Sequence, residues 1–234
     1  VFLAGDAAHV QPPAMAQGLS VGVQDAVNLG WKLAATINGW APDGLLDTYH
    51  AERHPIGEQL MRNARASIEL RLTGEEMDPV RSVLGELVAY KDAAGHLAGM
   101  LSGLGIHYDM GPGDHPLLGR RMPPDRELIG SDGRRTRVAD LLHAGRGVLI
   151  TTTGGTAEPA PPAQGWADRI DVIAGSWATG PAPAPDAVLI RPDGYTAWTS
   201  PGSDEDLTSA LGRWFGTART TVGARARSKG LNRH

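Results

Sequence analysis

The chain has 234 residues, of which 41% are hydrophobic and 21% charged, and its formal net charge is −4; this length predicts one or two domains. The small negative charge argues against a surface for nucleic acid or anionic membrane. The sequence also lacks cysteine, a long apolar run and a signal-peptide pattern, so we expect a cytoplasmic protein without disulfides, thiolate metal sites or thiol redox chemistry.

The first residues predict a ligand-binding turn. Residues 1–4 form a short apolar run that ends at Gly5, which is the pattern of a strand buried on both faces. Asp6 follows at the carboxyl end of this predicted strand, where open α/β sheets bind ligands. Its carboxylate can accept hydrogen bonds from the hydroxyls of a sugar or sugar alcohol. Pro12 and Pro13 fix φ twice and remove two donors, which predicts a stiff loop.

A long helix is predicted after this loop. Gly18 and Gly22 allow the backbone to approach a flat ligand closely. The free N–H groups at the start of a helix favour a negative charge, typically by about 0.3–1 kcal/mol. Apolar residues recur at helical spacing and predict an amphipathic helix, namely Leu19, Val23, Ala26, Val27, Gly30, Leu33, Ala34 and Ile37.

Further helices are predicted after this one. We expect one helix over Leu45–Arg53 that ends before Pro55, and another over Ile56–Leu72. Asp78 and Pro79 have the pattern of an N-cap followed by a proline in the first turn. The helix that they begin is expected to bury its apolar residues, Val80, Val83, Leu84, Leu87 and Val88.

The second half of the chain changes to alternating strands and helices. A short strand is expected at Ile106–Tyr108, and the Gly- and Pro-rich residues 111–118 predict a linker between a mostly helical domain, 1–110, and a second domain, 119–218. Its predicted elements are a helix over Arg137–His143, strands over 147–152, 170–173, 187–191 and 195–198, a hairpin turn at 192–194, and a closing helix capped by Asp204 with Leu207, Leu211, Trp214 and Phe215 inward. Residues 219–234 predict a disordered basic tail.

Three groups of residues resemble one family. Residues 5–9, 12–13, 17–19 and 24–33 together resemble the second FAD-binding motif of the flavoprotein aromatic hydroxylases of the para-hydroxybenzoate hydroxylase type. The series Tyr49, Glu52, Arg53 and Pro55 matches the tyrosine–acid–Arg–x–Pro segment of that family. Residues 119–123, 132–133, 138–142 and 189–195 are similar to the C-terminal domain of the aromatic polyketide hydroxylases of actinomycetes.

This resemblance implies a monooxygenase that hydroxylates an aromatic polyketide or phenolic substrate through a flavin C4a-hydroperoxide, with FAD as cofactor and NAD(P)H as reductant. Asp6 would bond a ribityl hydroxyl, Pro12 and Pro13 would lie beside the isoalloxazine ring, and the helix start would face the pyrimidine edge. The implied FAD-binding residues are Gly5, Asp6, Pro12, Pro13, Ala16, Gln17, Gly18, Leu19 and Ser20. Because the chemistry rests mainly on the flavin, we assign no catalytic acid or base and no metal site.

The implied fold class is α/β. It consists of the C-terminal part of the FAD-binding fold, a strand plus helices, followed by a thioredoxin-like α/β domain without a redox Cys-x-x-Cys motif. The G-x-G-x-x-G motif that holds the ADP half of FAD follows none of the predicted strands, so we expect the chain to be part of a longer enzyme. Three positions depart from the family pattern: Gln11 stands for His, Ala16 for Gly and Ser20 for Asn.

Two other functions are compatible with the sequence. The chain is either a non-catalytic remnant or interaction module of the family, or an unrelated hydrolase built on Asp6 and His9. The hydrolase is disfavoured because no nucleophile or third ligand occurs at a usable spacing. Flavin binding would distinguish the hydroxylase from both alternatives.

Overall fold

The computed structural model describes residues 1–12, 17–72, 74–152, 163–178 and 184–219. Its helices are α1 (Asp6–His9), α2 (Gly18–Ile37), α3 (Asp47–Leu72), α4 (Asp78–Val88), α5 (Lys91–Ser102), α6 (Val138–Leu141) and α7 (Leu207–Phe215), with 3₁₀ turns η1 (Glu75–Met77) and η2 (Ala163–Trp166). Its strands are β1 (Glu127–Gly130), β2 (Arg135–Arg137), β3 (Gly147–Thr152), β4 (Ile170–Trp177), β5 (Ala187–Ile190) and β6 (Thr196–Ser200).

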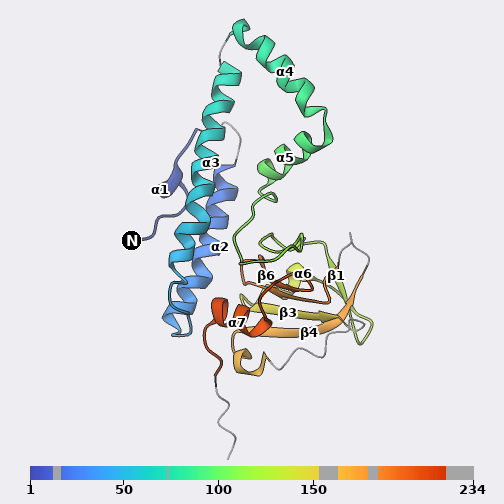
Figure 1. The fold of residues 1–234 in the computed structure, drawn as a ribbon. Coiled ribbons are helices and arrows are strands. Elements are labelled where there is room, and N and C mark those ends of the chain that lie inside the picture. The colour runs from blue at the N-terminus through green and yellow to red at the C-terminus, as the bar shows by residue number, and fades with distance from the viewer. Residues whose placement is uncertain (13–16, 73, 153–162, 179–183, 220–234) are drawn as a thin grey trace, which may run out of the picture.

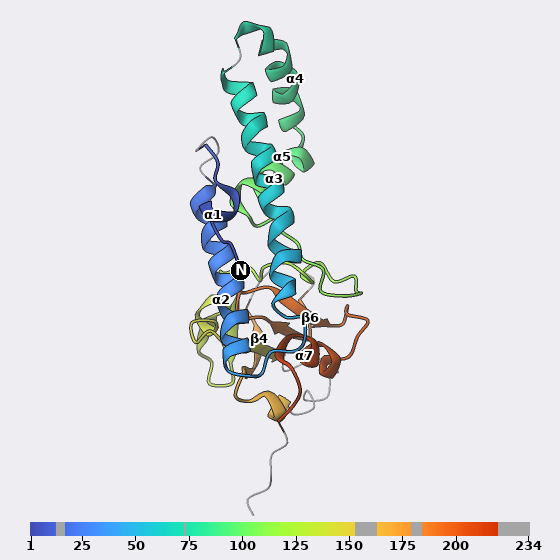
Figure 2. The same ribbon diagram turned by 90° about the vertical axis from the view of Figure 1, so that its left-hand side faces the viewer.

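The molecule consists of a helical arm and a sheet-containing unit (Figure 1). Helices α2 and α3 run side by side, and α4 and α5 lead the chain back from the far end of the arm toward the sheet. The turned view shows the arm projecting well beyond the sheet (Figure 2). None of the described helices combines the length and apolar character needed to cross a bilayer.

The six described strands form one mixed sheet in the order β2-β1-β4-β3-β5-β6. Strands β3 and β4 are parallel, whereas β5 pairs antiparallel with both β3 and β6. The predicted hairpin turn at 192–194 joins β5 to β6, as expected. Strands β1 and β2 were not predicted, because they contain only four and three residues and their apolar pattern is too short to identify.

Both faces of the sheet are covered. On one face, Leu149 and Leu189 pack with α7 and with Trp31, Ala35 and Leu45 from the helical arm. On the other face, Val148, Ile150, Val188 and Ile190 pack with Met122, Leu128 and Val138. Because successive strand residues point to opposite faces, β3 and β5 are buried on both sides, which explains their continuous apolar sequences. The first of these two cores joins the foot of the arm to the sheet.

The predicted strand at residues 1–4 is wrong. These residues are irregular in the structure, and Val1, Phe2 and Leu3 are exposed. A buried strand needs neighbouring strands, and no described strand lies beside this segment. It is held instead by Tyr49, whose hydroxyl donates a hydrogen bond of 2.6 Å to the Leu3 carbonyl.

Two predictions for the long helices also need correction. Helix α3 does not end before Pro55 but continues through it. Proline removes the hydrogen bond to the carbonyl four residues earlier, and both Pro55 and that residue, Ala51, are exposed, so water can replace the bond. Helix α2 spans the predicted region, but its apolar stripe faces outward, and Leu19, Val23, Val27 and Ile37 are exposed.

The apolar residues of α4 are likewise exposed rather than buried. Helix α4 begins at Asp78, with Pro79 in its first turn as predicted, but its N-cap is Met77 rather than Asp78, and the helix lies at the far end of the arm, away from both cores (Figure 1). Several exposed apolar side chains on one helix are typical of an interface.

The predicted strand at Ile106–Tyr108 is reduced to a single bridge between His107 and Arg120. The tail from residue 220 lies outside the described residues.

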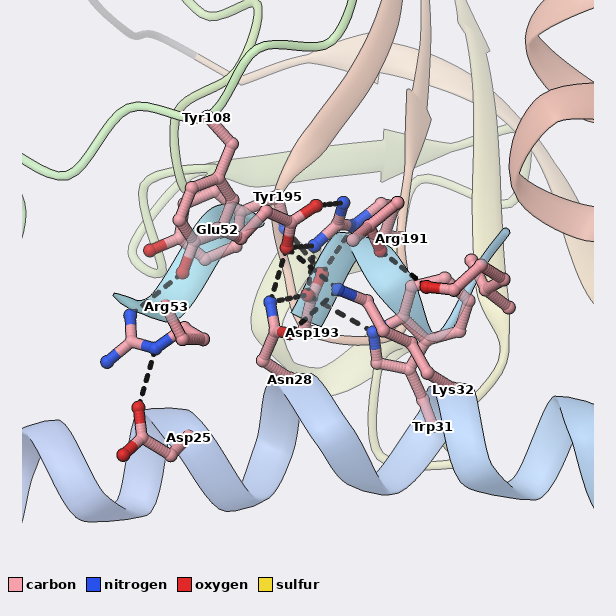
Figure 3. A network of polar contacts seen from close by, with 12 residues as sticks. Asp25, Asn28, Trp31, Lys32, Glu52, Arg53, Tyr108, Arg191, Asp193 and Tyr195 are labelled. Atoms are coloured by element: carbon pink, nitrogen blue, oxygen red, sulfur yellow. Dashed lines mark hydrogen bonds and ion pairs between the residues drawn. The ribbon is translucent and has the colours of Figure 1, made fainter. Parts of the chain in front are cut away.

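The buried face of α2 carries polar side chains that join the arm to the sheet-containing unit (Figure 3). Arg191 follows β5, is fully buried, and binds both oxygens of Glu52 on α3, at 2.6 and 2.9 Å. It also pairs with Asp193 in the hairpin turn. Lys32 donates to Glu52 at 3.0 Å. The Arg191 guanidinium lies 4.4 Å from the centroid of the Trp214 ring.

This network determines the charge states of its members. Burial would raise the pKa of Glu52, but hydrogen bonds and positive charge from Arg191, with Lys32 and Asn28, outweigh burial and lower that pKa to about 2. Burial lowers the pKa of Lys32 to about 8, although Glu52 opposes the shift. Asn28 and Trp31 add hydrogen bonds of 3.3 and 3.2 Å to Asp193. The charges are thus paired inside the protein, as buried charges must be.

We predict that Glu52→Gln destabilises the protein by about 3–5 kcal/mol at pH 7, because it removes one of the two carboxylates that neutralise the buried charges of Arg191 and Lys32. The pKa of Glu52 is lowered in the folded state, so its stabilising contribution is complete above pH 4.5, its ordinary pKa, and disappears as the pH falls toward about 2. Denaturant unfolding measured from pH 7 to pH 2 should show this loss in the wild type and not in Glu52→Gln. Glu58→Gln, an exposed position on the same helix, is the control and should retain the wild-type pH dependence.

The closing helix gives a second prediction. Its N-cap is Asp206 rather than the predicted Asp204, and the Asp206 carboxylate accepts a hydrogen bond of 2.8 Å from the Ser209 amide. Asp206→Ala should therefore lower the melting temperature by about 2–4 °C. Asp204→Ala should leave it unchanged. An equal effect of both substitutions in thermal unfolding would show that the cap is misassigned.

Candidate functional site

The site predicted from the sequence begins at the turn formed by Gly5 and α1. Gly5 has φ of +57° and precedes the single helical turn Asp6–His9. A β-carbon on Gly22 of α2 would come within 3.2 Å of the Gly5 α-carbon. The backbone of the turn and that of α2 therefore meet at two glycines: a larger residue at Gly22 would crowd Gly5, and the positive φ at Gly5 favours glycine.

Asp6 lies at the exposed side of this turn. Its carboxylate forms no hydrogen bond or ion pair with any other described residue. By contrast, the carboxylates of Asp25 and Glu52 are both buried in ion pairs. Asp6 thus presents free acceptor oxygens to solvent, which is the property that binding to hydroxyl groups requires.

The start of α2 provides a row of amides. The first helical hydrogen bond runs from the Val21 amide to the Gln17 carbonyl, at 3.0 Å. The amides of Gln17, Gly18, Leu19 and Ser20 are therefore the four that an α-helix leaves without an internal acceptor, and no other described residue accepts from them. Leu19 and Ser20 are exposed.

The other predicted FAD-binding residues differ in burial and in whether the structure describes them. Gln17 is buried, and its side-chain amide donates to the carbonyls of Met100 and Leu101 at 2.8 and 3.0 Å, which ties the start of α2 to the end of α5. Sequence reasoning gave no sign of this contact because the partners lie more than 80 residues away. Pro12 is exposed. Pro13 and Ala16 lie outside the described residues.

Sequence reasoning missed Asp25, the most engaged carboxylate near the turn. Its side chain is almost completely buried and accepts from the Gly5 amide at 3.0 Å, from His9 Nε2 at 2.6 Å and from Arg53 Nε at 2.7 Å. His9 is thus paired with Asp25 and not with Asp6, which removes the geometric basis for a hydrolytic Asp6–His9 dyad. The polar series Asp25, Asn28 and Lys32 has helical spacing opposite the apolar stripe and would have been the signal.

A cleft of about 330 Å³ lies between the beginning of α2, the middle of α3 and the end of α5. The described residues that line it include no Asp, Glu, Lys or Arg. Its polar residues are Gln17, Ser20, Gln24, Gln59, Asn63, His96, Ser102 and His107, and its apolar ones are Val21, Ile56, Leu60, Met100, Leu101 and Ile106. A lining of side-chain amides, hydroxyls, imidazoles and apolar groups suits an uncharged organic ligand. Gln17 and Ser20 belong both to this cleft and to the predicted FAD-binding residues.

Two family models match the chain. An FAD binding domain matches residues 1–64, and the C-terminal domain of aromatic-ring hydroxylases matches residues 115–218. The first match covers the turn, α2 and most of α3. The second covers the sheet and α7.

Individual relatives agree with the models. The chain is 44% identical to a rifampicin monooxygenase of Streptomyces venezuelae, over 93% of this chain and 42% of the relative, and 47% identical to an anhydrotetracycline monooxygenase of Streptomyces rimosus, over 92% and 43%. Among solved structures it is similar to CabE, an aromatic hydroxylase from angucycline biosynthesis, with 52% identity, a TM-score of 0.86, and coverage of 94% of this chain and 45% of that chain. The chain thus spans less than half the length of these relatives. It belongs to the family of FAD-dependent aromatic-ring hydroxylases.

Proposed function

We propose that this chain supplies one side of the FAD site in a monooxygenase that hydroxylates an aromatic polyketide or phenolic substrate, with NAD(P)H as the reductant. Two features together carry the proposal: Asp6 has an exposed carboxylate, and the start of α2 has a row of amides, and neither group has a hydrogen-bond partner among the described residues. The named monooxygenases among its relatives support the reaction class.

The described residues fit a flavin cofactor. Asp6 would accept a hydrogen bond from a ribityl hydroxyl, and the close contact of Gly5 with Gly22 holds the turn that carries it against α2. The amides of Gly18, Leu19 and Ser20 would face the pyrimidine edge of the ring, where a helix N-terminus stabilises negative charge, typically by about 0.3–1 kcal/mol. Pro12, with Pro13, would flank the ring. Bound FAD would supply the redox and oxygen-transfer chemistry; the residues of this chain bind and orient it.

The cleft beside Gln17 and Ser20 is the proposed place for part of the aromatic substrate. Its side-chain amides can donate to keto oxygens and accept from phenolic hydroxyls without charge, and its apolar residues can pack against a fused ring system. The relatives named for rifampicin, anhydrotetracycline and angucycline support a polycyclic substrate. Helix α5, which Gln17 ties to α2, would then determine the width of the cleft.

We also propose that residues 119–218 form a thioredoxin-like domain, that residues 111–118 divide it from the FAD-binding part, and that the enzyme acts in the cytoplasm. The arrangement β4-β3-β5-β6, with β3 and β4 parallel and the other pairs antiparallel, supports the first assignment. Because the sequence contains no cysteine, the role of this domain would be structural.

The proposal predicts that the purified chain binds FAD and that Asp6→Ala weakens this binding about ten- to hundredfold, which is the effect of losing a hydrogen bond to a charged group. Titration followed by flavin fluorescence quenching would measure the dissociation constant. Asp43→Ala, another exposed aspartate, should bind like the wild type.

Two results would contradict this assignment. Equal FAD affinity of the wild type and Asp6→Ala would show that Asp6 does not contact the ribityl chain. A folded wild-type chain that fails to bind FAD would show that these residues do not form a flavin site by themselves, and would favour the non-catalytic interaction module.

A further inference from the structure

The Asp25 side chain connects three separate parts of the molecule. Its Oδ2 accepts from the Gly5 amide and from His9 Nε2, at the two ends of the turn that carries Asp6, and its Oδ1 accepts from Arg53 on α3. We propose that Asp25 is a positioning residue that holds Asp6 in place for FAD, and that Tyr108 supports it by orienting Arg53. This inference rests on the proposed function, in which Asp6 contacts the cofactor.

Among the residues that the structure describes, Asp25 is the one whose side chain forms hydrogen bonds to the turn. Helix α1 is a single turn, in which the amides of Ala8 and His9 donate to the Gly5 carbonyl. It is seated between two helices at glycines: Gly22 of α2 faces Gly5, and a β-carbon on Gly57 of α3 would come within 3.3 Å of the His9 ring. Packing thus seats the turn closely between the two helices, and the hydrogen bonds to Asp25 hold it at both ends.

Arg53 links this anchor to the rest of the protein (Figure 3). Besides binding Asp25, its Nη1 donates to the Tyr108 hydroxyl at 2.8 Å. Tyr108 is held by the sheet-containing unit, because its ring stacks on Tyr195 at 4.2 Å and its amide donates to the Gly119 carbonyl at 2.8 Å. A continuous series of contacts therefore runs from Tyr195, directly before β6, through Tyr108, Arg53 and Asp25 to the turn that carries Asp6.

Burial makes the arrangement rigid. Asp25, Arg53 and Tyr108 are each at most 4% exposed, and a buried hydrogen bond to a charged group is stronger than one in water because the surroundings screen it less. Asp25 is inaccessible and both of its oxygens are occupied, so it can act on a cofactor only by placing the turn. Through Tyr108 and Arg53 the sheet-containing unit would help to place the cofactor. This role needs no thiol chemistry, for which the sequence has no cysteine.

The test uses the whole chain and amide hydrogen exchange measured residue by residue by NMR. Asp25→Ala should speed exchange at Gly5, Ala8 and His9 by about tenfold or more. Asp25→Asn keeps an oxygen that can accept from Gly5 and should show a smaller effect. Tyr108→Phe removes only the hydroxyl and should also speed exchange in the turn, while the amides of β3, in the core of the sheet, stay protected in all three variants.

Two matched controls are available. Asp43→Asn and Tyr90→Phe make the same chemical changes at exposed positions and should leave exchange in the turn unchanged. In parallel FAD titrations, the dissociation constant should increase in the order Asp43→Asn, Asp25→Asn, Asp25→Ala. A purely structural role for Asp25 would not give this graded rescue by Asn while the core remains protected.

The outcomes separate the two proposals. Unchanged exchange in the turn of Asp25→Ala and Tyr108→Phe overturns the positioning role, whatever the FAD result. If Asp25→Ala does not fold, Tyr108→Phe decides, since it deletes a single oxygen. Faster exchange in the turn without FAD binding by the wild type would support the anchoring of the turn but contradict the proposed function. Faster exchange with unaltered FAD affinity would overturn the link to the cofactor.

Discussion

The structure depends on one buried ion pair, Arg191 with Glu52. Arg191 comes from the hairpin between β5 and β6, and Glu52 comes from α3, so the pair joins the two parts of the molecule 139 residues apart in sequence. Its charges are acceptable in the interior only because Asp193, Lys32 and Asn28 complete their hydrogen bonds. Such a network strongly favours one relative placement of the helices and the sheet, since any other would leave a charge buried alone.

The geometry of the candidate site follows from this placement of the helices against the sheet. Once α2 and α3 are fixed against the sheet, Asp25 and Arg53 lie next to each other and next to Tyr108, and the turn at Gly5 is drawn onto them. The carboxylate of Asp6 is then left on the outside of the turn, free of partners among the described residues. An exposed acceptor on a turn that buried hydrogen bonds already hold in place suits the binding of a hydroxyl-rich cofactor, because little has to reorganise on binding.

Much of the fold could be predicted from local patterns. The strands β3 and β5, the 192–194 turn and the amphipathic α7 follow from continuous apolar runs, turn residues and helical spacing that need no distant partner to recognise. The predictions that failed are those that depend on which other segments pack against a helix or strand. Residues 1–4 have the composition of a buried strand but no described neighbour, Pro55 interrupts a pattern without ending the helix, and the apolar stripe of α2 faces outward.

The sequence by itself determined the family, the candidate flavin-binding residues and the start of the helix whose free amides accompany Asp6. Those are properties of short contiguous segments, in which residue type and spacing carry the information. Only the tertiary structure decided that the polar face of α2 is the buried one, that His9 pairs with Asp25, and that Gln17 reaches α5. These contacts join residues 16 to 83 positions apart, and periodicity cannot choose among the many polar side chains that could meet across such distances. The choice is made by the requirement that every buried charge finds its partner.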